Sequence, residues 1–348
     1  MQKKVDKRVN FSYKLNIKRK ESILKVGVSY FGNRILEHVQ TDMHLLKTIG
    51  FDFVVHTYSE NDLEFYEKTM HDIVKITKDE GLEVLLDPWG VGGFFGGEAY
   101  SAWVGKHPNI CQINSVFERV PAACPNNEEF REMIKAWITS AAQSKADYVF
   151  WDEPHFFQNF RKAGLWCCRC PSCLKKYKER YNEDMPLRKT PKVEFFKKES
   201  ILDFLKFATD EAEKEGLKNV VCVLPEAEES FLTKIASLPA LDTLATDPYG
   251  LYFGKPLKDF VRTETQKIKR AAEKYNKKTQ IWTQAFLVPS DKHREVIEGM
   301  DTAVDLGAES VAVWGYKACK YISSIASESP DDLWSMIEEW VMEKEENK

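Results

Sequence analysis

Apolar residues occur along the chain in short continuous runs, each followed by a longer stretch in which apolar positions recur at helical spacing. Such runs are typical of strands buried on both faces of a sheet, and the longer stretches are typical of amphipathic helices. Gly50, Gly81 and Gly216 each follow a helical stretch, and glycine is a common helix stop signal. Strands are therefore expected at 24–30, 51–57, 82–86, 147–151, 219–224, 243–246, 279–283 and 310–314.

The principal helices are expected at 34–49, 62–79, 127–144, 193–215, 227–236, 257–275, 292–306 and 330–343. Strict alternation of strands and helices predicts an α/β fold, namely a (β/α)8 or TIM barrel. A doubly wound open sheet is the alternative. The barrel is expected to form a single catalytic domain over residues 23–348, with long loops after its third and fourth strands. The basic residues 1–22 are expected to be an N-terminal arm.

Composition narrows the classes of partner. The 348 residues are 43% hydrophobic, enough for a sizeable core, and the net charge of -4 gives no reason to expect nucleic acid or an acidic membrane surface. The chain has neither an apolar run of about 18 residues nor an apolar secretory core near its start, so no membrane segment is expected. Eight cysteines without a secretory signal favour reduced or metal-bound thiols and a cytoplasmic location. A homo-oligomer is left open.

Carboxylates, amides and aromatic residues dominate the expected C-terminal ends of the strands, where a barrel enzyme carries its active site. Glycosidic bond hydrolysis needs such a set, because one carboxylic acid protonates the leaving oxygen while a second carboxylate attacks the anomeric carbon or activates water. The sequence therefore predicts a glycosidase that acts on a carbohydrate by a two-carboxylate mechanism. The candidate sugar-binding residues are Asp87, Trp89, His56, His155, Tyr249, Gln284 and Trp314.

Glu153 is the candidate general acid/base, because Pro154 and the aromatic neighbours would keep water away from it. Asp247, which ends a strand in the sequence DPYG, is the candidate opposing carboxylate. Asp152 is the third catalytic candidate. Neighbouring residues of an extended segment point to opposite faces, so one member of the Asp152–Glu153 pair is expected in the pocket and the other beside it. Ordinary polar turns at these positions are the alternative.

The glycine-rich segment 90–97, after the third strand, is expected to be a flexible rim or lid. It does not clearly open a helix, so it gives only a weak indication of a phosphate site.

Cys168, Cys170 and Cys173 follow the fourth strand at C-x-C-x-x-C spacing. Three thiols do not complete a tetrahedral zinc site, which takes four ligands. Cys124 is the strongest candidate for the fourth, because it lies in the preceding loop, and consecutive loops are neighbours in a barrel. Four thiolates would make a closed, structural zinc site beside the active site. Disulfides or free thiols are the alternative.

These motifs together resemble the family 42 glycoside hydrolases. The resemblance rests on Cys124-Pro125, on Phe130-Arg131, on the carboxylate after the fourth strand, and on the three clustered thiols followed by LKKYKERY. It covers roughly residues 120–182 in motif and the rest in architecture only. It implies a (β/α)8 enzyme, many members being β-galactosidases, with zinc at the four cysteines and an acid/base at Glu153.

Two positions depart from that family. It has asparagine before the acid/base, where this chain has Asp152, and its nucleophile is a glutamate that ends the seventh strand, where this chain has Gln284. An amide cannot act as a carboxylate nucleophile, and the later trimer-forming domains have no counterpart here, so β-galactosidase activity is not implied. Either the second carboxylate has moved, to Asp247, or a natural glutamate has been substituted, or the barrel binds sugar without cleaving it. An enzyme with metal at the carboxylates is a further alternative.

Overall fold

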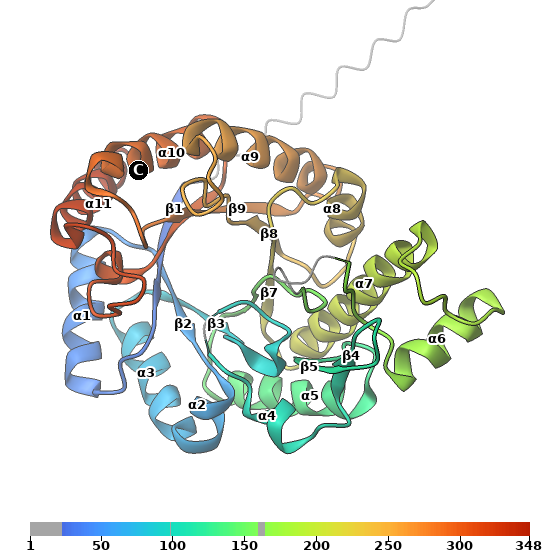
Figure 1. The fold of residues 1–348 in the computed structure, drawn as a ribbon. Helices are drawn as coiled ribbons and strands as arrows, with labels where there is room; N and C mark the ends of the chain where they lie inside the picture. Colours follow the sequence, from blue (N-terminus) through green and yellow to red (C-terminus); the bar gives the residue numbers. More distant parts are fainter. Residues whose placement is uncertain (1–22, 98, 159–163) are drawn as a thin grey trace, which may run out of the picture.

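The computed structural model describes residues 23–97, 99–158 and 164–348, so the arm expected at 1–22 lies outside the described residues. Eight parallel strands close into a barrel in the order β1-β10-β9-β8-β7-β6-β3-β2 (Figure 1). This confirms the predicted single-domain (β/α)8 barrel and excludes the open sheet. The strands are β1 (Lys25–Tyr30), β2 (Phe53–Thr57), β3 (Glu83–Asp87), β6 (Tyr148–Trp151), β7 (Lys218–Val223), β8 (Thr243–Thr246), β9 (Lys278–Gln284) and β10 (Ser310–Trp314).

A ring of helices surrounds the barrel (Figure 1). Its members are α1 (Leu36–Ile49), α3 (Glu67–Asp79), α5 (Glu128–Gln143), α7 (Pro191–Lys214), α8 (Glu229–Ala236), α9 (Leu257–Glu273), α10 (His293–Asp305) and α11 (Pro330–Glu346). Shorter helices stand in the loops: α2 (Glu60–Phe65), α4 (Ala102–Lys106), α6 (Pro171–Tyr181), η1 (Val91–Gly93), η2 (Ser290–Lys292) and η3 (Tyr316–Cys319). Helix α6 lies outside the ring (Figure 1). Among the helices described, none has the length and apolar character needed to cross a membrane.

Both faces of each barrel strand are buried, which explains the continuous apolar runs. In β2, Phe53 and Val55 belong to the cluster that fills the barrel, whereas Val54 packs in the layer between strands and helices. Large rings from non-adjacent strands fill the barrel interior, such as Phe150 on β6 and Trp282 on β9, whose centroids are 5.1 Å apart. The middle of the barrel is thus filled by side chains.

The loop after β3 contains an antiparallel hairpin of β4 (Cys111–Ile113) and β5 (Arg119–Ala123). The sequence analysis missed this hairpin because its strands are only three and five residues long. The hairpin joins the loop after β6: Arg169 N–H donates to the Ile113 carbonyl at 2.7 Å, and Asn114 pairs with Cys167 in an isolated bridge. The two longest loops at the barrel mouth are therefore hydrogen-bonded to each other.

Candidate active site and cysteine cluster

Four carboxylates converge at the C-terminal ends of the barrel strands. Asp87 ends β3, Asp152 and Glu153 follow β6, and Asp247 follows β8. Burial, followed by the charges of all four carboxylates, raises the pKa of the Cys222 thiol on β7, so each of them lies near this one point. Asp87, Asp152 and Asp247 are 0%, 9% and 2% exposed. The structure thus brings together carboxylates that are up to 160 positions apart in the sequence.

The chain turns sharply at Glu153, directly after β6. Its φ of 38° lies in the left-handed region, which costs a non-glycine residue about 1–3 kcal/mol. Two backbone hydrogen bonds hold the turn: Glu153 N–H donates to the Cys222 carbonyl at 3.1 Å, and Gly96 N–H donates to the Asp152 carbonyl at 3.0 Å. A Cβ on Gly96 would lie 2.3 Å from Asp152 Oδ2 and 3.4 Å from Glu153 Oε2. Both carboxylates therefore face the same region. The expectation of opposite faces is wrong because extended geometry ends at Trp151.

The glycine-rich segment 90–97 is a packed support for this turn, in contrast to the flexible rim expected from the sequence. The buried carboxylate of Glu60 accepts hydrogen bonds from the N–H groups of Gly92 and Trp103, both at 2.7 Å, and from the Ser101 hydroxyl at 2.6 Å. Burial raises the pKa of Glu60 although these hydrogen bonds oppose the shift. Sequence reasoning missed Glu60, since a glutamate at the start of a helix has the ordinary appearance of a solvated residue.

The electrostatics of Asp247 depend on its burial and on its neighbour Glu153. Burial raises the pKa of Asp247 well above its usual range, and the charge of Glu153, a hydrogen bond with Glu153 and the charge of Asp152 raise it further. The raised pKa favours the protonated form of Asp247 at this position beside Glu153. Asp247 Oδ1 is buried without a hydrogen-bond partner among the described residues.

Aromatic rings stand beside the carboxylates in two groups. Phe31, after β1, stacks on Trp314 at the end of β10 with centroids 5.5 Å apart, and it contacts Trp89, after β3, at 5.6 Å. Trp89 lies so close to Gly97 that a Cβ there would be 1.7 Å from its Cδ1. This close approach gives one reason for the glycines of the loop. Aromatic faces can stack on the apolar faces of sugar rings.

The second aromatic group follows β8 and β9. The edge of Tyr249 meets the face of Phe286 at 5.1 Å, and Tyr252 contacts the same ring at 5.8 Å. Burial and the charge of Asp247 raise the pKa of the Tyr249 phenol well above its usual range, so the hydroxyl keeps its proton. Tyr249 is therefore a neutral hydrogen-bond donor beside the acidic cluster.

Three of the candidate sugar-binding residues, His56, Gln284 and His155, have hydrogen-bond partners within the protein. His56 lies on the helix side of β2, where its Nε2 is 2.8 Å from Thr77 Oγ1 on α3, and burial lowers its pKa to about 3. Gln284 is buried, with both ends of its amide bonded to backbone: Nε2 donates to the Phe286 carbonyl and Oε1 accepts from Tyr252 N–H. His155 Nδ1 lies 2.5 Å from the Glu153 carbonyl oxygen. The structure does not bring His56 to the carboxylates.

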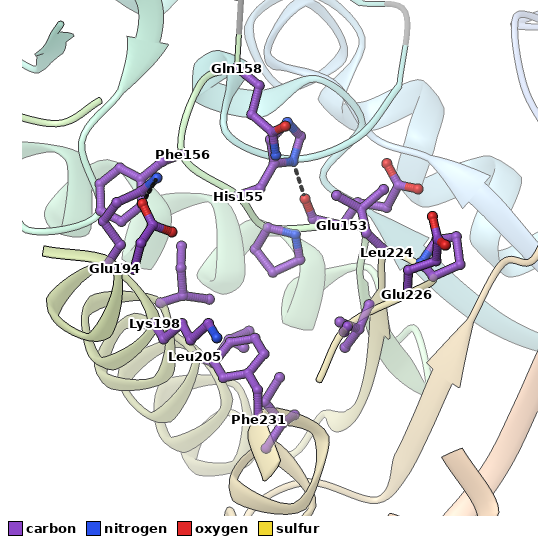
Figure 2. A pocket seen from close by; sticks show the side chains of 17 residues that line it. Glu153, His155, Phe156, Gln158, Glu194, Lys198, Leu205, Leu224, Glu226 and Phe231 are labelled. Atoms are coloured by element: carbon purple, nitrogen blue, oxygen red, sulfur yellow. Dashed lines mark hydrogen bonds and ion pairs between the residues drawn. The ribbon is translucent and has the colours of Figure 1, made fainter. Parts of the chain in front are cut away.

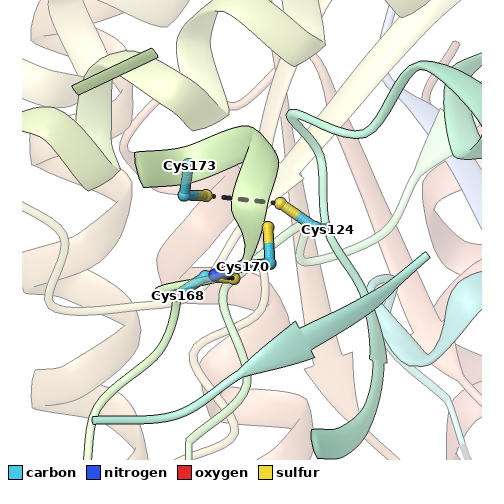
Figure 3. Close-up of side chains that lie close together, drawn as sticks. All are labelled: Cys124, Cys168, Cys170 and Cys173. Carbon is cyan, nitrogen blue, oxygen red and sulfur yellow. Dashed lines mark hydrogen bonds between the residues drawn. The ribbon is translucent and has the colours of Figure 1, made fainter. Parts of the chain in front are cut away.

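Cys124, Cys168, Cys170 and Cys173 are all buried, and their sulfur atoms lie within 4.8 Å of one another (Figure 3). The Sγ atoms of Cys124 and Cys173 are 3.4 Å apart. Within residues 23–97, 99–158 and 164–348, no other set of three or more potential ligand side chains is grouped as closely. All eight cysteines are free thiols in the structure. The four thiols that the sequence selected thus meet at one point.

The surroundings of the sulfurs fit thiolate ligands. Asn126 donates from its backbone N–H to Cys124 Sγ at 3.4 Å and from Nδ2 to Cys173 Sγ at 3.3 Å, and Cys170 N–H donates to Cys168 Sγ at 3.3 Å. Burial raises the pKa of Cys124 and Cys173 well above the usual range, so a full set of thiolates needs a cation among them. A tetrahedral thiolate set suits zinc or iron–sulfur chemistry.

A pocket of about 310 Å³ opens beside Glu153, between the loop after β6, the loop after β7 and helices α7 and α8. Figure 2 shows Glu153 and Leu224 on one side of this pocket and Leu205 and Phe231 on the other. Lys197 on α7 also lines it, and its side chain is 19% exposed. Sequence reasoning missed Lys197, because a lysine in an amphipathic helix is usually on the solvated face.

Comparisons with known proteins show the fold. No protein-family model matches the sequence, and no curated protein is similar to it. An endo-1,4-β-mannanase from Rhizomucor miehei is 10% identical, with a TM-score of 0.64 over 94% of this chain and 96% of that one. The pneumococcal virulence factor StrH is 10% identical, with a TM-score of 0.55 over 94% and 84%. A fungal β-1,4-galactanase is 12% identical, with a TM-score of 0.53 over 92% and 99%. At this level of identity the likeness establishes a shared barrel architecture.

Proposed function

We propose that this protein is a glycoside hydrolase that cleaves a glycosidic bond with Glu153 and Asp247. The observation that carries the proposal is the convergence of Glu153 and the buried Asp247, whose pKa is raised, beside aromatic rings. A glycosidase needs one protonated and one ionised carboxyl group at the same bond. The mannanase and the galactanase that share the barrel are named for activity on polysaccharides, which is consistent with this chemistry.

Glu153 is assigned the acid/base role because it lies between the carboxylate cluster and the side pocket, where a leaving group would stand. Asp247, deeper in the barrel mouth, is the opposing carboxylate. For this reaction the proton of Asp247 passes to Glu153 as the sugar binds between the two carboxyl groups, and Glu153 donates it to the glycosidic oxygen as that bond breaks. Asp247 then bonds to the anomeric carbon, and Glu153 takes a proton from the water that releases the sugar.

We propose a retaining reaction, because Glu153 lies close enough to Asp247 to contribute to its raised pKa. An inverting enzyme holds its carboxyl groups about 6.5–9.5 Å apart to admit a water molecule between carboxylate and sugar, whereas a retaining enzyme holds them about 5–5.5 Å apart. Asp152 and Asp87 are proposed to bind sugar hydroxyls, and Trp89, Trp314 and Tyr249 are proposed to contact the sugar ring. Gln284 is proposed to support this site by holding the backbone of Tyr252 and Phe286.

The cysteine cluster is proposed to hold one structural zinc ion. Four thiolates from Cys124, Cys168, Cys170 and Cys173 would fill the tetrahedral positions of zinc and leave none for substrate or water. Its contribution is therefore to hold the loops after β3 and β6 together next to Glu153. The hydrogen bonds from Asn126 to two of the sulfurs support this assignment.

The proposal is tested with a panel of nitrophenyl glycosides and oligosaccharides. Glu153→Gln should lose activity on unactivated substrates yet keep part of it on dinitrophenyl glycosides, whose leaving group needs no acid. Asp247→Asn should lose activity on both, by about 10⁴-fold or more, because no other group supplies the nucleophile. Hydrolysis that neither substitution affects would contradict the proposal.

A carbohydrate-binding barrel without catalysis is the second candidate. It is favoured by Gln284, whose amide stands at the end of β9 where the resembling family has its nucleophile. Saturable sugar binding to a protein that hydrolyses no member of the panel would support this second candidate.

A further inference from the structure

The pocket beside Glu153 differs in character from the mouth of the barrel. Its walls are mainly apolar and come from three parts of the chain: Phe156 after β6, Leu224 and Pro225 after β7, Ile201 and Leu205 on α7, and Phe231 and Ile235 on α8. Hydrogen-bonding side chains, among them Gln158, Glu194 and Lys197, also line the pocket, but its surface is mainly apolar. Apolar walls of this kind suit an aromatic or alkyl group.

Two of the charged side chains that line this pocket are held in ion pairs with residues outside its lining. Glu226 forms an ion pair with Lys255, and Lys198 forms one with Glu228 at 2.6 Å. Lys197 differs: its hydrogen bond to Glu194 Oε1 is long, at 3.5 Å, and the same oxygen lies 3.1 Å from Lys189. Its ammonium group also stands 5.8 Å from the centroid of Phe156, which forms part of the apolar wall.

Lys197 therefore places a weakly satisfied positive charge on the wall of an apolar cavity of about 310 Å³. Removing an ammonium group from water is unfavourable unless an anion or several hydrogen bonds replace that water. Burial accordingly lowers the pKa of Lys197, and the neighbouring Glu194 only partly opposes this. A ligand with an anionic group would supply the close ion-pair partner that the Lys197 ammonium group lacks within the protein.

We infer that this pocket binds an aromatic or alkyl group that carries a carboxylate, with the carboxylate at Lys197. This inference adds a substrate class to the proposed glycosidase, and the identity of the substrate rests on that proposed function. Glu153 separates the sugar side from the pocket, so the substrate is a glycoside whose sugar lies at the barrel mouth and whose leaving group is an apolar carboxylic acid. Protonation of the glycosidic oxygen by Glu153 releases this acid with its hydroxyl group intact.

The test measures binding without turnover, using 3-phenylpropanoate and the neutral 3-phenylpropanamide as a matched pair of probes in NMR titrations. The anion should bind at least about tenfold more tightly than the amide, since a hydrogen bond to a charged group contributes more than one between neutral groups. Lys197→Met should remove this preference and leave amide binding unchanged. Lys206→Met is the control, because Lys206 lies on the same helix and pairs at the surface with Asp210.

Equal binding of the two probes by the unsubstituted protein, or no saturable binding of either, would overturn the inference, and neither result depends on a variant that folds. An equal effect of the two lysine substitutions would also overturn it. Probe binding as expected without any glycoside hydrolysis would keep the pocket and reject the glycosidase. Hydrolysis without probe binding would reject the pocket alone.

Discussion

Gly96 donates its backbone N–H to the carbonyl of Asp152 at 3.0 Å, and its Cα faces the carboxylate of the same residue. A Cβ at this position would lie 2.3 Å from Asp152 Oδ2 and 2.9 Å from Asp152 Cγ. The absence of a side chain on Gly96 is thus what allows the loop after β3 to support the turn after β6. Any side chain there would move a carboxylate of the candidate site.

Gly96→Ala should lower kcat/KM on the best substrate of the panel by about 100-fold, because a displacement near 1 Å is enough to disturb a catalytic geometry. Gly105→Ala is the control: Gly105 lies in α4 with nothing within 4 Å of an added Cβ, and it should keep full activity. Equal activities of the two variants would show that Asp152 tolerates the displacement. Thermal unfolding of both proteins checks that the loss is local.

Asp247→Asn should make the protein more stable at neutral pH. The pKa of Asp247 is raised in the folded state, so the native protein holds this proton more tightly than the unfolded chain does. Stability due to this group is full below about pH 3.9 and is lost as pH rises through the folded-state pKa, by about 1.4 kcal/mol per pKa unit. The variant lacks this loss, so its advantage should grow from pH 4.5 to pH 8.

Denaturant unfolding at both pH values measures this advantage. Asp259→Asn is the control, since Asp259 is exposed on α9 and pairs with Arg262. A constant difference between Asp247→Asn and the unsubstituted protein across this range would show that Asp247 is ionised in the native state.

Cys124→Ser should reduce bound zinc from about one ion per chain to well below it, and should lower Tm by roughly 10 °C, because metal binding free energy is part of the folding free energy. Cys111→Ser should keep the metal, since Cys111 is a buried thiol of the neighbouring hairpin whose Sγ lies near the Val104 carbonyl, outside the cluster. Metal analysis and calorimetry are the measurements. A fully metallated Cys124→Ser protein would remove this residue from the ligand set.

Glu60→Ala should destabilise the loop after β3, because the buried N–H groups of Gly92 and Trp103 would lose their acceptor at about 1–3 kcal/mol each. We expect limited proteolysis within residues 90–103 to become faster. Glu64→Ala is the matched control on the same helix, where Glu64 forms an exposed ion pair with Lys106. If both variants resist proteolysis equally, the loop is held by its packing and not by Glu60.

The fold could be predicted from the sequence because eight strands buried on both faces appear as short continuous apolar runs between amphipathic helices. His56 was expected at the barrel mouth, but side chains alternate along β2. Val55 faces the barrel interior, so His56 faces α3. The direction of Glu153 depends on a left-handed φ at a non-glycine residue, which no local pattern indicates. Glu60 and Lys197 owe their importance to partners distant in the chain, so their residue types alone could not single them out.

The cysteine cluster joins residues 124 and 173, and β6 lies within the segment that they enclose. A metal ion bound there closes this segment into a ring of some fifty residues, in the manner of a cross-link that removes about 4 kcal/mol of chain entropy from the unfolded state. The strand that carries Asp152 and Glu153 cannot then separate from its neighbours by fraying of the adjoining loops. We expect its amide hydrogens to exchange with solvent only through global opening of the barrel, and to become exchangeable through local opening once a chelator removes the metal.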